Sequence, residues 1–216
     1  MTLEGTNTFV VGEGPVYVID PGPADEAHIG AVRAEAERRG GIEGVVLTHS
    51  HLDHSEGADA LGAPVVAGER VGPFETIPTP GHASDHVCLL LGRVLFSGDL
   101  ILGEGSSYVP PDGGSLVAYL ESLRRVGELD LELICPGHGP WITDPSAKVT
   151  EYVEHKLDRE RKLVAALESG ERSRAALLDA AWDDVPRELR PAAAQVMQAH
   201  LEKLESEDRL PGDLVD

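Results

Sequence analysis

Short apolar runs alternate with polar, glycine-rich turns over the first two thirds of the chain. This pattern predicts strands that are separated by loops and helices. The two shortest connections, Gly12 to Pro15 and Gly92-Arg93, predict hairpins. The runs expected to form strands are 8–11, 16–19, 45–48, 64–67, 87–91, 94–96 and 131–135.

Helical periodicity marks the segments between and after these runs. Residues 24–39 place apolar side chains on one face and end at a glycine pair, and Ser115 is the expected cap of a helix with its own apolar stripe. Beyond Trp141 only helical periodicity remains, so we expect a mixed α/β domain over residues 1–144 and a helical domain over 145–216. The helices expected in the second domain cover 148–167, 173–182 and 191–204.

A cluster of potential metal ligands follows the run at 45–48. The segment from Thr48 to His54 reads THSHLDH, and it offers three imidazoles and a carboxylate. These groups suit zinc and its first-row neighbours, although an isolated cluster of this kind is often a solvated polar turn. Three more candidates follow strand-like runs and lie beside glycine, which favours a site for two metal ions. They are His82, Asp99 and His138.

Four motifs of the chain resemble those of the metallo-β-lactamase-fold superfamily of hydrolases: THSHLDH, PGH, SGD and PGHG. Within that superfamily, the GTNTF, LGEG and YVEH segments look most like the beta-lactamase-like protein 2 family, with the glyoxalase II thioesterases as near relatives. The resemblance implies an αββα sandwich that carries the catalytic site over residues 1–144 and a winged-helix-like domain over 145–216. It begins almost at Met1, so an edge strand of the family pattern is expected to lie upstream of this sequence.

The same resemblance implies how two divalent ions would be held. We expect zinc, with manganese and iron as alternatives. A carboxylate between the ions, rather than a thiolate, resembles the thioesterase and nuclease branches and disfavours antibiotic hydrolysis. His49, His51 and His82 would hold one ion, Asp53, His54 and His138 the other, and Asp99 would bridge them.

The expected chemistry is metal-assisted hydrolysis. Two ions about 3.5 to 4 Å apart would share a water whose pKa falls from about 15.7 to about 7, which makes hydroxide available at neutral pH. The expected catalytic carboxylates are Asp53, as proton acceptor or relay, and Asp99, which fixes the ion pair. His86 is a candidate ligand, but a supporting role beside the ligands is preferred, and Ser84 competes for that role.

Three further residues have two interpretations each. Tyr108, in the Gly-, Ser- and Pro-rich loop after Asp99, is either a substrate contact or an ordinary loop residue. Lys156 and Arg159 share a helix face and could meet an anionic substrate tail. The interleaved acidic residues instead favour surface ion pairing.

Composition narrows the choice of partners. Thirty-eight acidic and eighteen basic residues give a formal net charge of −20, whereas nucleic-acid affinity comes from Lys and Arg that replace counterions. The last predicted helix ends in an acidic cluster, so a lid or packing module is expected rather than a DNA reader. We expect a small-molecule substrate and no nucleic acid, with a homodimer as a possible assembly.

Cysteine usage and hydropathy bear on the compartment. Cys88 and Cys135 lie in apolar runs and are expected to be reduced and buried. No run approaches the roughly eighteen apolar residues of a membrane helix, and the N-terminus lacks the features of a secretory signal. We therefore expect a cytoplasmic protein without membrane contact.

Three functions remain. The first is hydrolysis of a small thioester or ester, favoured by the bridging Asp99, the acidic composition and the likeness to glyoxalase II. The second is a single-strand-specific endoribonuclease of the beta-lactamase-like protein 2 type. The third is a non-enzymatic winged-helix regulator with a structural metal, which is disfavoured because structural zinc is usually closed by four Cys or His ligands.

Overall fold

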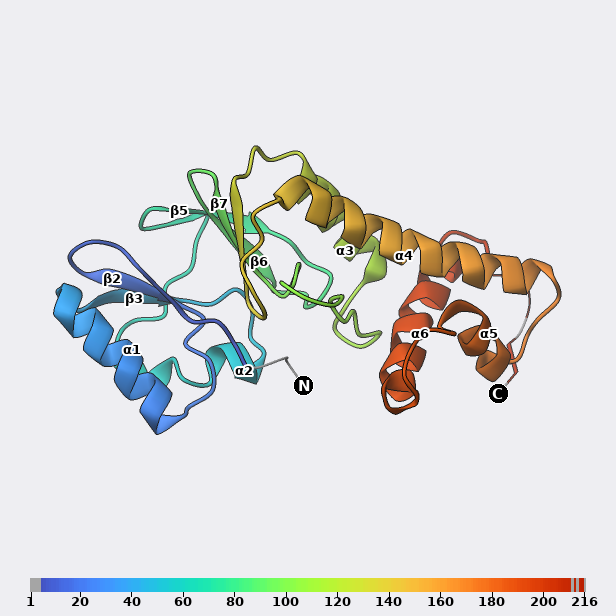
Figure 1. The fold of residues 1–216 in the computed structure, drawn as a ribbon, viewed down its shortest axis with the longest axis horizontal. Coiled ribbons are helices and arrows are strands. Elements are labelled where there is room, and N and C mark those ends of the chain that lie inside the picture. The colour runs from blue at the N-terminus through green and yellow to red at the C-terminus, as the bar shows by residue number, and fades with distance from the viewer. Residues whose placement is uncertain (1–4, 211, 213, 216) are drawn as a thin grey trace.

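The computed structural model describes residues 5–210, 212, 214 and 215. Strands and helices alternate as far as the eighth strand, and the chain is helical from there on (Figure 1). An edge strand before Gly5 would lie outside the described residues. Within the described part, no helix is long and apolar enough to cross a membrane.

The first sheet has the order β1-β2-β3. β1 and β2 form the expected antiparallel hairpin, whereas β2 and β3 are parallel and are joined by helix α1. The side chain of Asp25 caps the start of α1, and Gly40 ends it in the left-handed conformation, with φ 115°. The elements are β1 (Phe9–Val11), β2 (Val16–Ile19), α1 (Glu26–Arg39) and β3 (Ile42–Val46).

The second sheet has the order β4-β5-β6-β7-β8. β6 and β7 form the second expected hairpin, and β8 returns parallel to β7 after helix α3, which Ser115 caps as expected. The elements are β4 (Arg70–Val71), β5 (Phe74–Pro78), β6 (Val87–Leu91), β7 (Val94–Gly98), α3 (Leu116–Gly127) and β8 (Leu133–Pro136).

The connection between the two sheets differs from the prediction. After β3 the chain forms a short helix, α2 (Leu52–Ser55), and a 3-10 turn, η1 (Asp59–Leu61). The strand expected at 64–67 is reduced to one bridge between Val45 and Val65. Pro64 lacks an N–H and Gly68 has φ 155°, so regular pairing ends there and the chain crosses to the second sheet.

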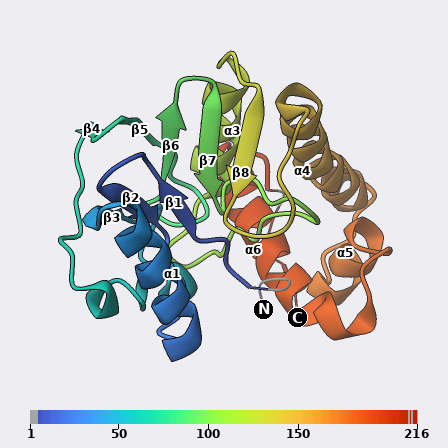
Figure 2. The same cartoon turned by 60° about the vertical axis from the view of Figure 1, so that its left-hand side comes forward.

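The two sheets pack face to face, with α1 against the first and α3 and α4 beyond the second (Figure 2). This is the expected αββα sandwich. Its apolar side chains are almost completely removed from water, which supplies most of the stabilisation. The buried residues between the sheets are Ile19, Val46, Val71, Phe74, Leu89, Phe96 and Cys135. Cys88 and Cys135 are free and buried, as predicted.

The C-terminal helices build a core of their own. Helix α4 begins directly after Asp144, where the sequence predicts the boundary between domains. Tyr152 in its first half nonetheless packs into the α3 side of the sandwich, whereas Leu163 belongs to the C-terminal core. One helix thus joins both cores, and the boundary stays a prediction. The helices are α4 (Pro145–Glu168), α5 (Arg174–Ala181), the 3-10 turn η2 (Arg187–Leu189) and α6 (Arg190–Ser206).

Candidate metal centre

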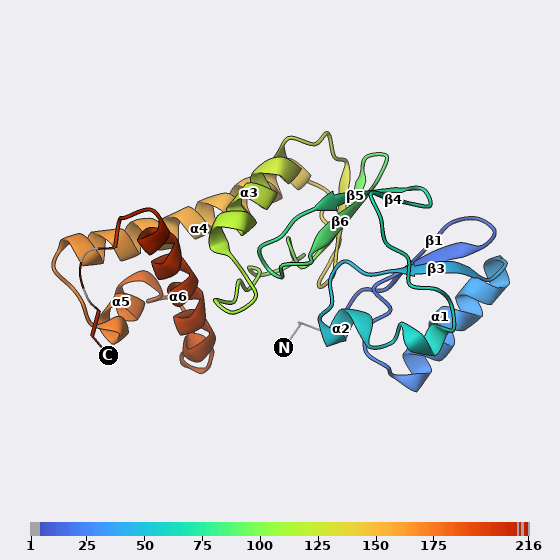
Figure 3. The same cartoon turned by 180° about the vertical axis from the view of Figure 1, so that it is seen from behind.

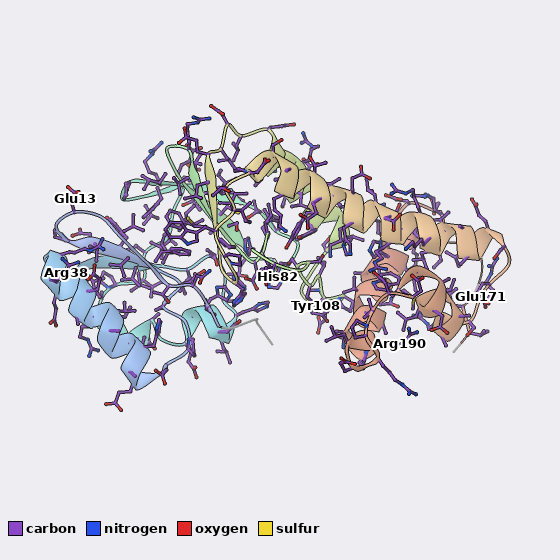
Figure 4. The ribbon with its side chains drawn as sticks, in the orientation of Figure 1. Glu13, Arg38, His82, Tyr108, Glu171 and Arg190 are labelled. Atoms are coloured by element: carbon purple, nitrogen blue, oxygen red, sulfur yellow. The ribbon has the colours of Figure 1, made fainter. Side chains whose placement is uncertain are left out.

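The candidate ligands come together at one edge of the sandwich because of strand topology. β7 and β8 are parallel, so Asp99 and His138 leave the second sheet on the same side. The N–H of Val87, at the start of β6, donates to the carbonyl of Thr48 over 2.8 Å and joins the His82 loop to the loop after β3. Figure 4 shows His82 and Tyr108 between the sandwich and the C-terminal helices.

Three imidazoles form the first group of potential ligands. The Nε2 atoms of His49 and His82 each lie 3.0 Å from Nδ1 of His51. Two tetrahedral ligands with Zn–N bonds of about 2.0 to 2.1 Å would lie about 3.3 Å apart. The three nitrogens therefore fit around one ion with only small movements.

Two imidazoles and a carboxylate form the second group. Nε2 of His54 lies 3.2 Å from Nε2 of His138, which in turn lies 3.4 Å from Oδ2 of Asp53. His54 is completely buried, whereas the Asp53 side chain is 36% exposed. This group therefore has one carboxylate that solvent can reach.

Asp99 lies between the two groups. Its Oδ1 is 3.4 Å from Nε2 of His54 and 3.3 Å from Nε2 of His138, and its Oδ2 is 3.6 Å from Nε2 of His82. Oδ1 is buried and has no hydrogen-bond partner among the described residues. A buried carboxylate oxygen without a donor suits a metal ligand, so the donor set fits divalent ions.

The remote nitrogen of four imidazoles is occupied by the protein. The hydroxyl of Thr48 donates to Asp20, so its oxygen accepts from His49. Such bonds fix the ring orientation and leave the other nitrogen free as a ligand. The Nδ1 contacts are His49 to Thr48 Oγ1 (3.0 Å), His54 to Asp20 (2.9 Å), His82 to the Tyr108 carbonyl (2.7 Å) and His138 to the Gly5 carbonyl (2.8 Å).

Asp20 is a supporting residue that the motifs did not reveal. Its carboxylate accepts from the N–H and the hydroxyl of Thr48, both over 2.7 Å, and contacts His54. It ends β2 with φ 46°, a left-handed conformation that Asp tolerates better than most residues. In the sequence, Asp20 is visible only as a carboxylate directly after an apolar run. Its role becomes clear only in the structure, because the parallel pairing of β2 with β3 brings it next to Thr48.

His86 supports Asp99. It is buried, its Nδ1 lies 2.9 Å from the Thr79 hydroxyl, and its Nε2 accepts from the Asp99 N–H over 3.1 Å. Burial, followed by the neighbouring His82, lowers the pKa of His86 to about 3 and keeps it neutral. Ser84 lies on the exposed turn between these histidines and makes no hydrogen bond to a ligand within the described residues.

The loop 102–114 is held between the ligands and the C-terminal helices. The Ser107 hydroxyl donates to the Asp99 carbonyl over 2.5 Å, and Lys156 of α4 donates to the Ser107 carbonyl over 2.8 Å. Tyr108 accepts from His82 through its carbonyl and donates its hydroxyl to Gln195 of α6. The loop therefore connects the candidate site to α4 and α6.

Lys156 and Arg159 are not surface residues, so the expected surface ion pairing is wrong. They are only 2% and 6% exposed, because Lys156 lies against Ser107 and the Tyr119 ring, and Arg159 lies against Ala181 and the Trp182 ring. Arg159 donates to the Ala181 carbonyl and to both oxygens of Asp184. Burial, with a smaller effect of Arg159, lowers the pKa of Lys156 to about 8. Both cations are thus occupied by protein groups.

Charges within the ligand cluster compensate one another. Burial would lower the pKa of His54, but its hydrogen bond to Asp20 and the negative charges of Asp20 and Asp99 outweigh that effect and raise the pKa to about 10. Burial would raise the pKa of Asp99, and the imidazoles of His138 and His54 instead hold it far below its ordinary range. A metal ion that binds His54 would have to displace its proton, so metal binding at this group should depend on pH.

Known proteins are similar to this chain in sequence and in fold. The sequence pattern of the metallo-beta-lactamase superfamily matches residues 1–64 and 62–138. A beta-lactamase-like protein 2 homolog of Drosophila melanogaster is 31% identical over 97% of this chain and 85% of its own length. The chain belongs to the metallo-beta-lactamase superfamily. The pattern of the beta-lactamase associated winged helix domain matches residues 173–210 and identifies the C-terminal helices of this superfamily member.

Further relatives show the range of this superfamily. An atrochrysone carboxyl ACP thioesterase of Aspergillus fumigatus is 32% identical over 83% of this chain and 65% of its own length. A metallo-beta-lactamase family protein from Thermus thermophilus has the same fold, with a TM-score of 0.73, 22% identity and coverage of 94% of this chain and 89% of its own. TTHA1623, solved in a di-iron-bound form, is 28% identical with a TM-score of 0.52, and the match covers 66% of this chain and 93% of that one.

Proposed function

We propose that this chain is a hydrolase that uses two divalent ions to cleave a small thioester or ester. The observation that carries the proposal is the pair of ligand groups on either side of the Asp99 carboxylate, whose Oδ1 has no hydrogen-bond partner among the described residues. Two such groups match a site for two ions better than the closed four-ligand site of a structural zinc. The di-iron form of TTHA1623 and the thioesterase named among the relatives support the same proposal.

The protein groups have distinct roles in this reaction. Bound ions would polarise the substrate carbonyl and acidify water. Asp53 is the carboxylate of the site that solvent reaches, so it accepts the proton of the attacking water and returns it to the leaving thiolate. Asp99 is held through its backbone N–H by His86 and through its carbonyl by Ser107, which keeps its two oxygens facing the two ligand groups.

Charge favours a small ester or thioester over RNA. The net charge of −20 repels a phosphate polymer, and Lys156 and Arg159 of α4 are buried. A short acyl compound carries little charge and is not repelled. The ribonuclease and the metal-holding regulator are the two alternatives, and one experiment distinguishes them from the thioester hydrolase.

The experiment is a substrate panel with the metal-loaded protein. Short S-acyl thioesters should be hydrolysed, unstructured RNA should not be cleaved, and His49→Ala should lose at least about a hundredfold in kcat/KM, since loss of a group that only supports a ligand already costs about 10- to 100-fold. His28→Ala, which removes a half-buried imidazole of α1, is the matched control. RNA cleavage without thioester hydrolysis would establish the ribonuclease, and inactivity with one bound metal would establish the regulator.

A further inference from the structure

A groove of about 910 Å³ runs along one open side of the sandwich. One wall is the edge of the first sheet, where the chain after Pro64 continues beside β3. The other wall is formed by β5 and β6, and the segment between η1 and β4 crosses from one sheet to the other (Figure 3). The apolar residues lining the groove are Val46, Leu47, Val65, Val66, Ala67, Val71, Pro78, Val87 and Leu89.

One end of the groove belongs to the candidate metal centre. His49, Ser50 and Asp85 line this end, where the carboxyl end of β3 meets the amino end of β6. Glu75 and Arg70 line the opposite end. The part of β5 from Glu75 to Pro78 spans about 10 Å at the usual rise per residue, so the groove leads from the ligands into a separate apolar space.

The lining selects an aliphatic occupant. Val65 is 50% exposed, and burying such side chains beneath a ligand is favourable. None of the described residues that line the groove carries a phenyl, phenol or indole ring, so stacked nucleobases have no platform there. Three carboxylates against one guanidinium at its rim also disfavour a phosphate group. They are Glu69, Glu75 and Asp85, with Arg70.

The wall formed by residues 65–70 directly follows the place where two matches to the superfamily pattern meet. The two matches overlap at residues 62–64, and residues 65–70 lie within the second one. The alignment with the Drosophila relative spans 255 positions, more than the 216 residues of this chain, so that relative carries residues without a counterpart here.

We propose that this groove, the acyl groove, holds the aliphatic acyl chain of a thioester whose carbonyl lies at the metal centre. The inference rests on the proposed function and names its substrate class, a thioester of a medium-chain fatty acid. Water adds to the carbonyl carbon and the C–S bond breaks, which yields the carboxylate, the free thiol and one proton. The acyl chain remains in the acyl groove throughout the reaction. Its length therefore affects both the affinity for the substrate and the orientation of the carbonyl group.

Chain-length dependence tests the acyl groove. For acetyl, butanoyl, hexanoyl and octanoyl thioesters of one short thiol, kcat/KM should rise by up to about fourfold per buried methylene. Ala67→Trp fills the groove from its exposed wall and should remove at least tenfold of the octanoyl activity while acetyl hydrolysis stays within twofold. Ala60→Trp, at an exposed alanine of η1 outside the lining, is the matched control and should retain the full chain-length dependence.

A binding measurement separates the acyl groove from the chemistry. An octyl thioether cannot be hydrolysed, and calorimetry should show that it binds the wild-type protein and the Ala60→Trp variant with equal affinity. Its affinity for the Ala67→Trp variant should be at least tenfold lower. Equal rates for acetyl and octanoyl thioesters, with no effect of Ala67→Trp, overturn the acyl groove and leave thioester hydrolysis standing. Thioether binding without hydrolysis of any thioester overturns the proposed function instead. If the Ala67→Trp variant had a lower molar mass in solution than the wild-type protein, the substitution would have broken a dimer. The groove would then hold a second copy of the chain, which overturns the inference.

Discussion

At the scale of single residues, the site depends on hydrogen bonds that aim each imidazole. Asp20 is the most connected of these supporting groups, because it binds both the backbone and the hydroxyl of Thr48 and also His54. Its backbone conformation is one that Asn also tolerates. Asp20→Asn therefore changes the charge of this group with little change in shape.

We expect Asp20→Asn to weaken divalent-metal binding by about 10- to 100-fold, as is typical when a ligand's partner is lost. The introduced amide carries no negative charge, so the variant loses the carboxylate that holds the His54 ring in place. Competition with a fluorescent chelator measures the affinity, and Glu43→Gln, an exposed carboxylate on β3, is the control. An unchanged affinity in Asp20→Asn would remove Asp20 from the site.

His200 gives a prediction about acid stability. It is completely buried beside Trp182, with neither ring nitrogen hydrogen-bonded within the described residues. Burial, followed by the charges of Lys156 and Lys203, lowers its pKa to about 3. Between pH 6.5 and 3 the unfolded chain binds the proton and the folded chain does not, so the free energy of unfolding falls as the pH falls.

Relative to His200→Leu, the wild-type protein should lose about 1.4 kcal/mol of unfolding free energy for each pH unit below 6.5. At pH 7.5 the variant should be as stable as the wild type or more stable, because it removes two buried polar atoms without partners. Urea unfolding of both proteins between pH 5 and 7.5 measures the difference. Parallel stability curves over that range would show that His200 binds its proton at the same pH in the folded and the unfolded protein, which would contradict the lowered pKa.

The candidate ligands that the structure brings together were predictable from the sequence because they occur in short motifs, each at the end of an apolar run. Their partners were not. Asp20 and Thr48 meet only because β2 and β3 are parallel neighbours, and sequence spacing carries no signal for that pairing. The supporting role of His86 was predictable because it lies in the same turn as His82.

At the scale of secondary-structure elements, period and turn residues predicted both hairpins and the long helices, within a few residues. Two predictions were wrong. The strand at 64–67 forms a single bridge. Lys156 and Arg159 are buried, not on the surface. The charge pattern did not predict this, because it describes α4 as an isolated helix and contains no information about which face its neighbours cover.

The position of Lys156 leads to a prediction about the loop 102–114. Removing its ammonium group releases the Ser107 carbonyl, and Ser107 holds Asp99. Lys156→Met should lower kcat about tenfold, consistent with about 1.5 to 3 kcal/mol for a hydrogen bond from a charged donor. Its unfolding free energy should change less, because the cost of burying the charge is also removed.

Lys162→Met is the matched control, since this lysine lies on the same helix with its charged end exposed and paired to Asp158. Its kcat should stay within twofold of the wild type. If Lys156→Met and Lys162→Met had the same kcat, α4 would have no part in orienting Asp99.

At the scale of the whole molecule, the net charge of −20 is the dominant feature. Like charges over a small surface repel one another and destabilise the compact state. Raising the salt concentration from about 0.1 M to about 1 M shortens the screening length from about 10 Å to about 3 Å. The melting temperature should therefore rise by several degrees, as differential scanning fluorimetry can show.

Sucrose at matched osmolality is the control for solvent exclusion. A melting temperature that falls with salt would mean that the exposed ion pairs, such as Arg124 with Glu121 and Glu128, stabilise the fold more than the net charge destabilises it.

The most direct test of a two-ion hydrolase is a titration of metal-free protein with zinc, followed by the rate of hydrolysis of one S-acyl thioester. We expect negligible turnover in the metal-free protein and a maximum at two ions per chain, with His49→Ala inactive throughout. Full turnover without metal, or a maximum at one ion per chain, would contradict a site in which Asp99 joins two ligand groups.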